Sequence, residues 1–346
     1  MRANRLRRLR VFASGAVALG VVLLAPLKEQ VSGQRLPAPA LIAAVPAPRI
    51  AAPAPPLYDA RDYDIPVVFN DDVHRMIDAY CHRVRDRFEQ GLVNASRFEP
   101  MVRASFKAEG LPQDLEYVAL IESSFRPRAS SHARAEGIWQ FVNSTGRRFG
   151  LRSDRLVDER ADPVKATDAA ARFWTTLYAE YKDWHLAMAA YNAGEGRVSG
   201  AMRRTGLSNY WDLCRQNALP EETCNYVPGV IAAATIAKNP QRFGFLIRAQ
   251  EPLRYDTVMI ARAIDLKSLA KKSAIDLDEL RKLNPELRTT RTPPSYRLII
   301  PAESHFTIES SLTALPAPSR LDGRRGGRTL LAENGLAGHR RRRSRG

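Results

Sequence analysis

Apolar positions between residues 71 and 239 recur mostly at spacings of three and four, which is the period of amphipathic helices. The pattern predicts two helices between Asp71 and Lys107, followed later by helices at Pro163–Tyr181 and Trp184–Ala193. Asp162 is placed to cap the first of these later helices. The chain is therefore predicted to be mainly α-helical over most of its length.

One helix, which begins at Pro112, carries a carboxylate on its apolar face. Leu115, Val118, Ala119 and Glu122 fall at spacings of three and four. Burial raises the pKa of a carboxyl group, so a buried acid can stay protonated near neutral pH and act as a general acid. The alternative is that Glu122 caps the helix end or pairs with an arginine.

A second cluster, GIWQF at residues 137–141, places an indole beside a primary amide. Trp139 offers a flat apolar face, and Gln140 offers hydrogen-bonding groups. We expect this pair to form a surface that receives a sugar.

Several short motifs, taken in order along the chain, resemble the signature of the soluble lytic transglycosylase (SLT) family. The motifs are ESSF at 122–125 with Pro127 and Ser131, GIWQF at 137–141, TG at 145–146, AAYNAGEGRV at 189–198, and ET at 222–223 followed by YVP at 226–228. Within the family they look most like the membrane-bound lytic transglycosylases of the D type. The resemblance covers roughly residues 64–245.

The resemblance implies a lysozyme-like helical domain whose helices line a groove. It also implies an enzyme that cleaves the MurNAc–GlcNAc β-1,4 bond of peptidoglycan and leaves a 1,6-anhydroMurNAc end. Glu122 would be the single acid/base, protonating the glycosidic oxygen and then taking a proton from the C6 hydroxyl. Retaining glycosidases need a second carboxylate about 5 Å away, whereas this route needs one.

The same resemblance implies a set of residues that bind the substrate or shape the groove: Ser131, Gln140, Tyr191, Asn192, Glu222 and Tyr226. Tyr191 is expected beside the catalytic carboxyl, where it would help the substrate's N-acetyl group to stabilise the oxocarbenium-like state. Glu222 is expected to orient the substrate or Tyr226. Glu195 and Arg197 are expected to form a structural ion pair.

Two positions depart from the family pattern. Arg126 stands where relatives mostly have asparagine, and Arg134 stands where they mostly have glycine. Arg134 would lie close to the groove, where it would narrow the groove or contact a peptide stem.

Two other functions stay open at this point. One is a hydrolytic, goose-type lysozyme in which Glu136 or Glu222 activates water. The other is a non-enzymatic wall-binding scaffold, against which the intact set of Glu122, Gln140 and Tyr191 argues.

The segment 251–302 has a different pattern from the helical body, which is assigned to residues 61–250. A strand is predicted at Thr257–Ala263, helices at Leu266–Lys272 and Leu277–Leu283, and a strand at Tyr296–Pro301. This βααβ order resembles a LysM module, which binds N-acetylglucosamine chains. The glycine-rich and aromatic ligand loops of such modules are not evident, so sugar binding and a structural docking role both stay open.

Basic residues concentrate at the two ends of the chain, whose net charge is +16. An arginine-rich start and an apolar run at residues 11–25 make residues 1–33 an export signal or an uncleaved anchor. Residues 34–60 are a Pro/Ala-rich linker, and residues 303–346 are predicted to be a basic, disordered tail. The protein is expected in the periplasm or cell envelope, either free or anchored in the inner membrane. The tail would then meet anionic membrane or wall polymers and not nucleic acid.

The cysteines are Cys81, Cys214 and Cys224. In an exported protein, Cys214 and Cys224 either bridge a short loop or remain free buried thiols. The histidines are scattered and no CxxC or HExxH motif occurs, so no metal and no other cofactor is expected.

Overall fold

The computed structural model describes residues 59–315 of the chain. The predicted export signal, nearly all of the proline-rich linker and the arginine-rich part of the tail lie outside the described residues. Among the residues that are described, no helix is both long and apolar enough to cross a membrane.

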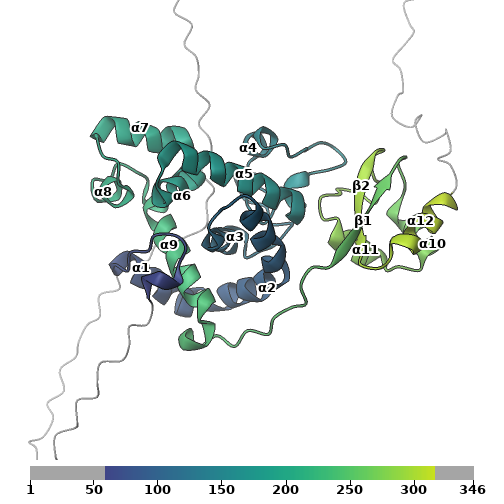
Figure 1. Cartoon of the computed structure of the whole chain (residues 1–346), viewed down its shortest axis with the longest axis horizontal. Helices are drawn as coiled ribbons and strands as arrows, with labels where there is room; N and C mark the ends of the chain where they lie inside the picture. The colour runs from purple at the N-terminus through teal and green to yellow at the C-terminus, as the bar shows by residue number, and fades with distance from the viewer. Residues whose placement is uncertain (1–58, 316–346) are drawn as a thin grey trace, which may run out of the picture.

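The first part of the described chain is a bundle of helices (Figure 1). The helices are α1 (Asp71–Asp78), α2 (Arg85–Ala108), α3 (Glu116–Ser123), α4 (Asn143–Arg148), α5 (Pro163–Tyr181), α6 (Trp184–Ala193), α7 (Glu195–Thr205), α8 (Tyr210–Arg215) and α9 (Glu221–Lys238). A π-helical turn at Ala79–Arg83 separates α1 from α2. Helix α3 lies at the centre, with α2 and α9 packed against it.

The short central helix α3 is buried along nearly its whole length. A 3₁₀ turn at Gln113–Leu115 precedes it. Asp114 in that turn is paired with Lys238, 2.6 Å away at the end of α9. At the other end, Ser124 adopts a left-handed conformation (φ 55°) that stops the helix. These two ends fix the position of the last turn, which carries Glu122.

Helices α5 and α6 have the bounds predicted from the sequence. The carboxylate of Asp162 accepts hydrogen bonds from the Val164 and Lys165 backbone N–H groups, as expected for an N-cap. The side chain of Asp183 caps α6 in the same way through the Leu186 N–H. Local capping thus determines where both helices begin.

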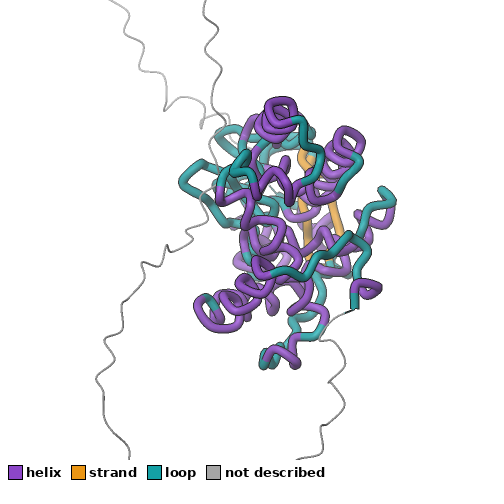
Figure 2. Tube along the Cα trace, turned by 90° about the vertical axis from the view of Figure 1, so that its left-hand side faces the viewer, coloured by secondary structure: helices purple, strands orange, loops and turns teal. Residues whose placement is uncertain are grey.

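The second part of the described chain is a small module around a two-stranded antiparallel sheet, whose strands are drawn in orange in Figure 2. Its elements are β1 (Tyr255–Ile260), α10 (Leu266–Ser273), α11 (Leu277–Leu283), β2 (Tyr296–Pro301) and α12 (His305–Thr313). Strand β1 begins and ends earlier than predicted, and it ends at Ile260 because the chain bends at residues 261–262. The predicted fold class, mainly α with a small βααβ module, is confirmed.

Helix α12 corrects the prediction of a disordered tail from residue 303 onward. Ile308 on this helix is fully buried in the core of the module, and Leu312 packs against that core. The glycine, proline and arginine content of the later residues obscures this short apolar pattern in the sequence. Ordered structure therefore extends at least to residue 315.

The module is attached to the helical body through a short extended segment before α5. The Asp158 N–H donates to the Glu286 carbonyl at 2.9 Å, and the Arg288 N–H donates to the Leu156 carbonyl at 2.9 Å. Between these bonds, the fully buried Val157 side chain joins the module's apolar core. The body thus contributes a residue to the core of the module.

A disulfide joins Cys214 in α8 to Cys224 in the first turns of α9, with 5.5 Å between the Cα atoms. Of the two alternatives left open by the sequence, the structure shows the bridged one. Cys81 is a free, buried thiol.

Candidate active site

The carboxyl group of Glu122 lies in the last turn of α3 and is nearly buried, with 7% of the residue exposed. The Tyr226 hydroxyl, from α9, donates a hydrogen bond to its Oε1 atom at 2.7 Å. The turn is held from the other side by the Ser123 hydroxyl, which donates to the Ile138 carbonyl at 2.8 Å. Glu122 therefore has a defined position between two helices and the GIWQF loop.

Burial raises the pKa of Glu122 to about 7, against an ordinary value of 4.5. The nearby carboxylate of Glu222 raises this pKa further, and the hydrogen bond from Tyr226 lowers it. Among the described residues, no lysine or arginine pairs with Glu122, so the ion-pair alternative does not hold. A carboxyl with this pKa exchanges its proton near neutral pH, as a general acid/base must.

Two tyrosines line the interior beside this carboxyl. Tyr191 in α6 stacks on the Trp174 ring with 4.4 Å between centroids, and its hydroxyl donates to the Trp139 carbonyl at 2.6 Å. Burial raises the pKa of both Tyr191 and Tyr226, and the Glu122 charge adds to each shift. Both phenols therefore stay protonated and act as hydrogen-bond donors.

The second carboxylate of the site, Glu222, lies in the first turn of α9. Burial raises its pKa, while a hydrogen bond with Asn192 and the charge of Arg197 lower it. The Thr223 hydroxyl donates to Asn192 Oδ1 at 2.9 Å. Asn192 thus links the end of α6 to the start of α9, and it holds Glu222 at the edge of the site.

The expected ion pair between Glu195 and Arg197 is wrong. Glu195 binds the guanidinium of Arg148 at 2.7 Å, and Arg197 acts on Glu222. Residues two apart on a helix point to different sides, so the two side chains do not face each other. Arg197 is a member of the site that the sequence pattern did not indicate.

The expectation of a sugar-binding surface at Trp139 is also wrong. The indole is completely buried, packs on Phe106 and donates its N–H to the Thr167 hydroxyl at 2.9 Å. The neighbouring Gln140 is also buried, and its amide nitrogen donates to the Ala129 and Gly137 carbonyls. These two side chains hold the loop together from inside.

Ser131 lies in the turn that precedes this loop and is partly exposed. Its hydroxyl accepts a hydrogen bond from the Ala135 N–H at 3.1 Å. Arg134, in the same turn, has a φ of 58°, in the left-handed region that favours glycine. The carboxylate of Glu136 accepts a hydrogen bond from the Ser130 hydroxyl at 2.8 Å, so Glu136 is bound within the turn.

Arg160 is a structural residue of the site that the sequence did not reveal. Its buried guanidinium donates to the Arg134 and Phe141 carbonyls at 2.8 and 3.0 Å and pairs with Asp158. Asp158 also binds Arg288 of the module at 2.7 Å. One buried ion pair thus connects the loop beside Glu122 with the docked module.

In the helical domain, Tyr226, Tyr191 and Glu222 lie around the buried Glu122, and Asn192 contacts Glu222. Residues 99–214 match the family model described as the transglycosylase SLT domain, and residues 254–317 match the LysM-like domain of lytic transglycosylase MltD. The chain therefore contains an SLT domain followed by an MltD LysM-like domain, and the resemblance to the SLT family predicted from the sequence is confirmed.

Individual proteins are also similar to this chain. The chain is 31% identical over 251 residues to membrane-bound lytic murein transglycosylase D of Escherichia coli (strain K12), covering 67% of this chain. The match spans only 54% of that relative's length. A putative tributyltin chloride resistance protein of Alteromonas sp. (strain M-1) is 34% identical over 114 residues, covering 32% of this chain and 55% of its own.

One solved structure is also similar, an inactive variant of lytic transglycosylase Slt from Pseudomonas aeruginosa. It is 24% identical, with a TM-score of 0.35, over 42% of this chain and 24% of its own. In the described part of the chain, no group of three or more His, Cys, Asp or Glu side chains is arranged to hold a metal ion.

Proposed function

We propose that this protein is a peptidoglycan lytic transglycosylase, which cleaves the MurNAc–GlcNAc β-1,4 bond and forms a 1,6-anhydroMurNAc end. The observation that carries this function is the buried Glu122 carboxyl with a pKa of about 7, placed by the family's motifs. The matched relatives named as lytic murein transglycosylases support the same reaction.

In the proposed reaction, protonated Glu122 gives its proton to the glycosidic oxygen as the bond to the MurNAc C1 atom breaks. Positive charge then develops on C1, and the substrate's own N-acetyl oxygen stabilises it. The resulting Glu122 carboxylate takes the proton of the C6 hydroxyl, whose oxygen bonds to C1 of the same sugar. No water is consumed, and Glu122 ends protonated, ready for another turnover.

The hydroxyl of Tyr226 can assist Glu122 both when it acts as an acid and when it acts as a base. Tyr226 donates to Oε1 in either state, so it holds the carboxyl in one orientation and stabilises the ionised form. This hydrogen bond therefore offsets part of the effect of burial, and the pKa of Glu122 is about 7. Of the other residues expected to bind the substrate, Tyr191 lies near Glu122, and Asn192 is hydrogen-bonded to Glu222.

A hydrolytic reaction would need a second carboxylate that holds a water, roughly 6.5–9.5 Å from the acid in inverting enzymes. Glu136 is bound to the Ser130 hydroxyl, so it is poorly placed for this role. The Glu222 carboxylate forms a hydrogen bond with Asn192 and interacts with the positive charge of Arg197. Both contacts fit a positioning role for Glu222 better than the role of a base.

The test is a comparison of Glu122→Gln with Glu136→Gln, a carboxylate in the same region. We expect Glu122→Gln to lose at least about 10²–10⁴-fold of the sacculus-clearing rate, since the general acid is removed. Glu136→Gln should keep nearly the wild-type rate. The assignment would be contradicted if a folded Glu122→Gln protein cleared sacculi at nearly the wild-type rate. Loss of sacculus clearing in Glu136→Gln would also contradict it.

The cellular setting is part of the same proposal. We infer that the protein is exported to the periplasm or cell envelope, where the N-terminal segment is either removed or retained as an inner-membrane anchor. The LysM-like module, residues 254–317, would contact the glycan strands of peptidoglycan. The basic tail would contact anionic membrane or wall polymers.

A further inference from the structure

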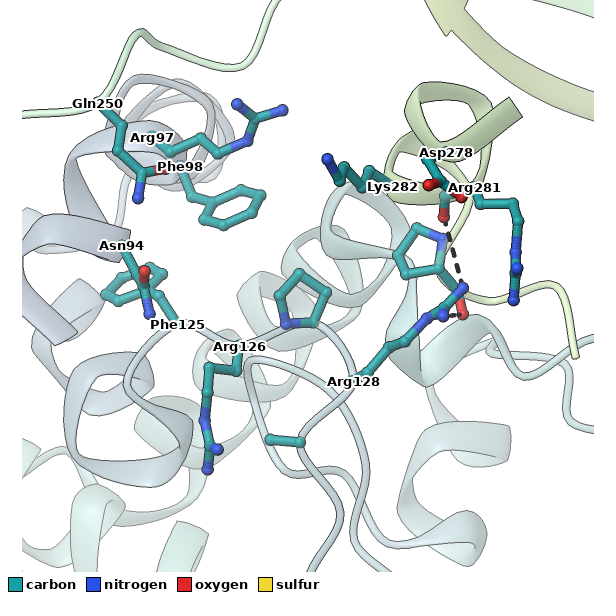
Figure 3. Close-up of a pocket in the computed structure, with 13 residues that line it drawn as sticks. Asn94, Arg97, Phe98, Phe125, Arg126, Arg128, Gln250, Asp278, Arg281 and Lys282 are labelled. Atoms are coloured by element: carbon teal, nitrogen blue, oxygen red, sulfur yellow. Dashed lines mark hydrogen bonds between the residues drawn. The ribbon is translucent and has the colours of Figure 1, made fainter. Parts of the chain in front are cut away.

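A cavity of about 670 Å³ lies where the helical body meets the module, outside the set of residues described around Glu122. Its walls come from α2, from the loop that follows α3, and from α11 of the module (Figure 3). The volume falls within the usual range for sites that bind small molecules. Neither domain forms this cavity alone.

The lining of the cavity is strongly basic. One acid, Asp278, faces five cations from the two domains: Arg97, Arg126, Arg128, Arg281 and Lys282. Within the described range 59–315, none of these five forms an ion pair with a carboxylate. Unneutralised cations around a concave surface create a positive potential that attracts anionic groups.

The wall between the two domains is held in place by Arg128. Its guanidinium donates to the Pro285 carbonyl at 3.2 Å and to the Arg281 carbonyl at 3.4 Å, both at the end of α11 (Figure 3). A cation at a helix C-terminus complements the dipole of the helix. This side chain therefore joins the module to the loop. Arg126 donates to the Ser123 carbonyl at 3.0 Å, so the cations left to meet a ligand are Arg97, Arg281 and Lys282.

Three side chains converge on the open centre of the cavity. Figure 3 shows Arg97 and Phe98 from α2 and Lys282 from α11 pointing toward one another across it. Phe98 lies parallel to Phe125 with 6.4 Å between ring centroids, and both are almost fully buried. The cavity thus offers two cationic groups above an apolar floor, with Asp278 at one side.

The cavity is close to the catalytic acid along the chain. Phe125 follows Glu122 by three residues, so its Cα atom lies within about 11 Å of the Glu122 Cα atom. A peptide of four residues spans about 13 Å when extended. A peptide attached to a sugar bound at Glu122 is therefore long enough to span the distance from Glu122 to Phe125, which lines this cavity.

We propose that this cavity binds the peptide stem of peptidoglycan through the stem's carboxylates, and this role rests on the proposed function. The stem's carboxylates meet Arg97 and Lys282, and its short alkyl side chains contact the small part of Phe98 that remains exposed. Asp278 provides a partner for the ammonium group of a diamino acid in the stem. An anionic lipid surface fits less well because the apolar floor and Asp278 lie inside a cavity between two domains.

The direct test is calorimetric titration of the full-length protein with a synthetic stem tetrapeptide that carries free carboxylates. We expect Arg97→Glu and Lys282→Glu to weaken binding about tenfold each, since attraction becomes repulsion at a partly exposed site. Lys271→Glu, an exposed charge reversal on α10 outside the cavity, should change the affinity less than twofold. The same peptide with its carboxylates amidated should bind at least tenfold more weakly than the free acid.

Three results would overturn the inference: no binding by the wild type, equal binding by the charge-reversed variants, or displacement of the peptide by anionic phosphatidylglycerol vesicles. Thermal melts show whether Arg97→Glu is folded, and the exposed Lys282→Glu decides the matter if it is not. Because peptide binding needs no turnover, it separates this inference from the proposed reaction. If turnover occurs, the KM ratio of stem-bearing to stem-free glycan should rise about tenfold in both variants.

Discussion

Replacing Tyr226 by phenylalanine removes the hydroxyl that donates to Glu122 at 2.7 Å inside the site. That hydrogen bond lowers the pKa of Glu122, while burial and the Glu222 charge raise it to the net value of about 7. In Tyr226→Phe the ionised carboxylate loses this stabilisation. We therefore expect the pKa of Glu122 to rise.

The size of the shift follows from the strength of such a bond. A hydrogen bond to a charged group contributes about 1.5–3 kcal/mol, and one pKa unit corresponds to about 1.4 kcal/mol. The pKa of Glu122 should then move up by about one to two units. Because the acid must be protonated to act, wild-type activity falls as pH rises through about 7. In Tyr226→Phe this fall should occur at a pH one to two units higher.

The assay is the pH dependence of kcat/KM on soluble glycan strands, with Tyr210→Phe as the matched control. Tyr210 is also buried, but its hydroxyl donates to the Thr223 and Cys224 carbonyls within α9. In Tyr210→Phe, the fall of kcat/KM with rising pH (the alkaline limb of the profile) should therefore stay near pH 7. An alkaline limb that stays in place or moves to lower pH in Tyr226→Phe would refute the assigned role of Tyr226.

Three further outcomes are expected, each measured by urea unfolding. The folded state of the wild type holds the Glu122 proton up to about pH 7 and the unfolded state up to about 4.5, so stability falls as pH rises between these values. Glu122→Gln should therefore gain up to about 3 kcal/mol over the wild type at pH 8 but little at pH 4, and an equal difference at both would contradict the shifted pKa. Gly137→Ala should cost more than about 3 kcal/mol because its Cβ would lie 1.7 Å from the Arg160 carbonyl oxygen. Gly194→Ala, with a similar φ of +89° but no atom within 4 Å, should cost about 1–3 kcal/mol, and similar losses in both would refute the clash. Replacing both Cys214 and Cys224 by serine should cost about 2–3 kcal/mol, and unchanged stability would show that the disulfide adds nothing.

What the sequence predicted well depends on local signals. Helix α5 has its predicted bounds because Asp162 and Pro163 mark its start within one turn of chain. The burial of Glu122 was predicted for a similar reason, since its spacing places it on the apolar face of α3. Such signals act over a few residues and can be read without knowledge of the fold.

The predictions from the sequence that were wrong concern residues whose contacts are distant along the chain. The flat indole of Trp139 suggested a sugar-binding residue, but the side chain is buried through contacts with Phe106 and Thr167. The pairing of Glu195 with Arg148 spans 47 residues, and no periodicity indicates it. The cavity at Lys282 depends on how the module docks, which the sequence of neither domain determines alone.

The central claim is that Glu122 acts without a second catalytic carboxylate and that a C6 hydroxyl replaces water. Mass spectrometry of the muropeptides released from sacculi measures this directly, because an anhydro product is one water lighter than its hydrolytic counterpart. The account predicts products that end almost entirely in 1,6-anhydroMurNAc and that borohydride does not reduce. A digest dominated by the heavier, reducible species would contradict it and would make Glu222 the leading candidate for a base that activates water.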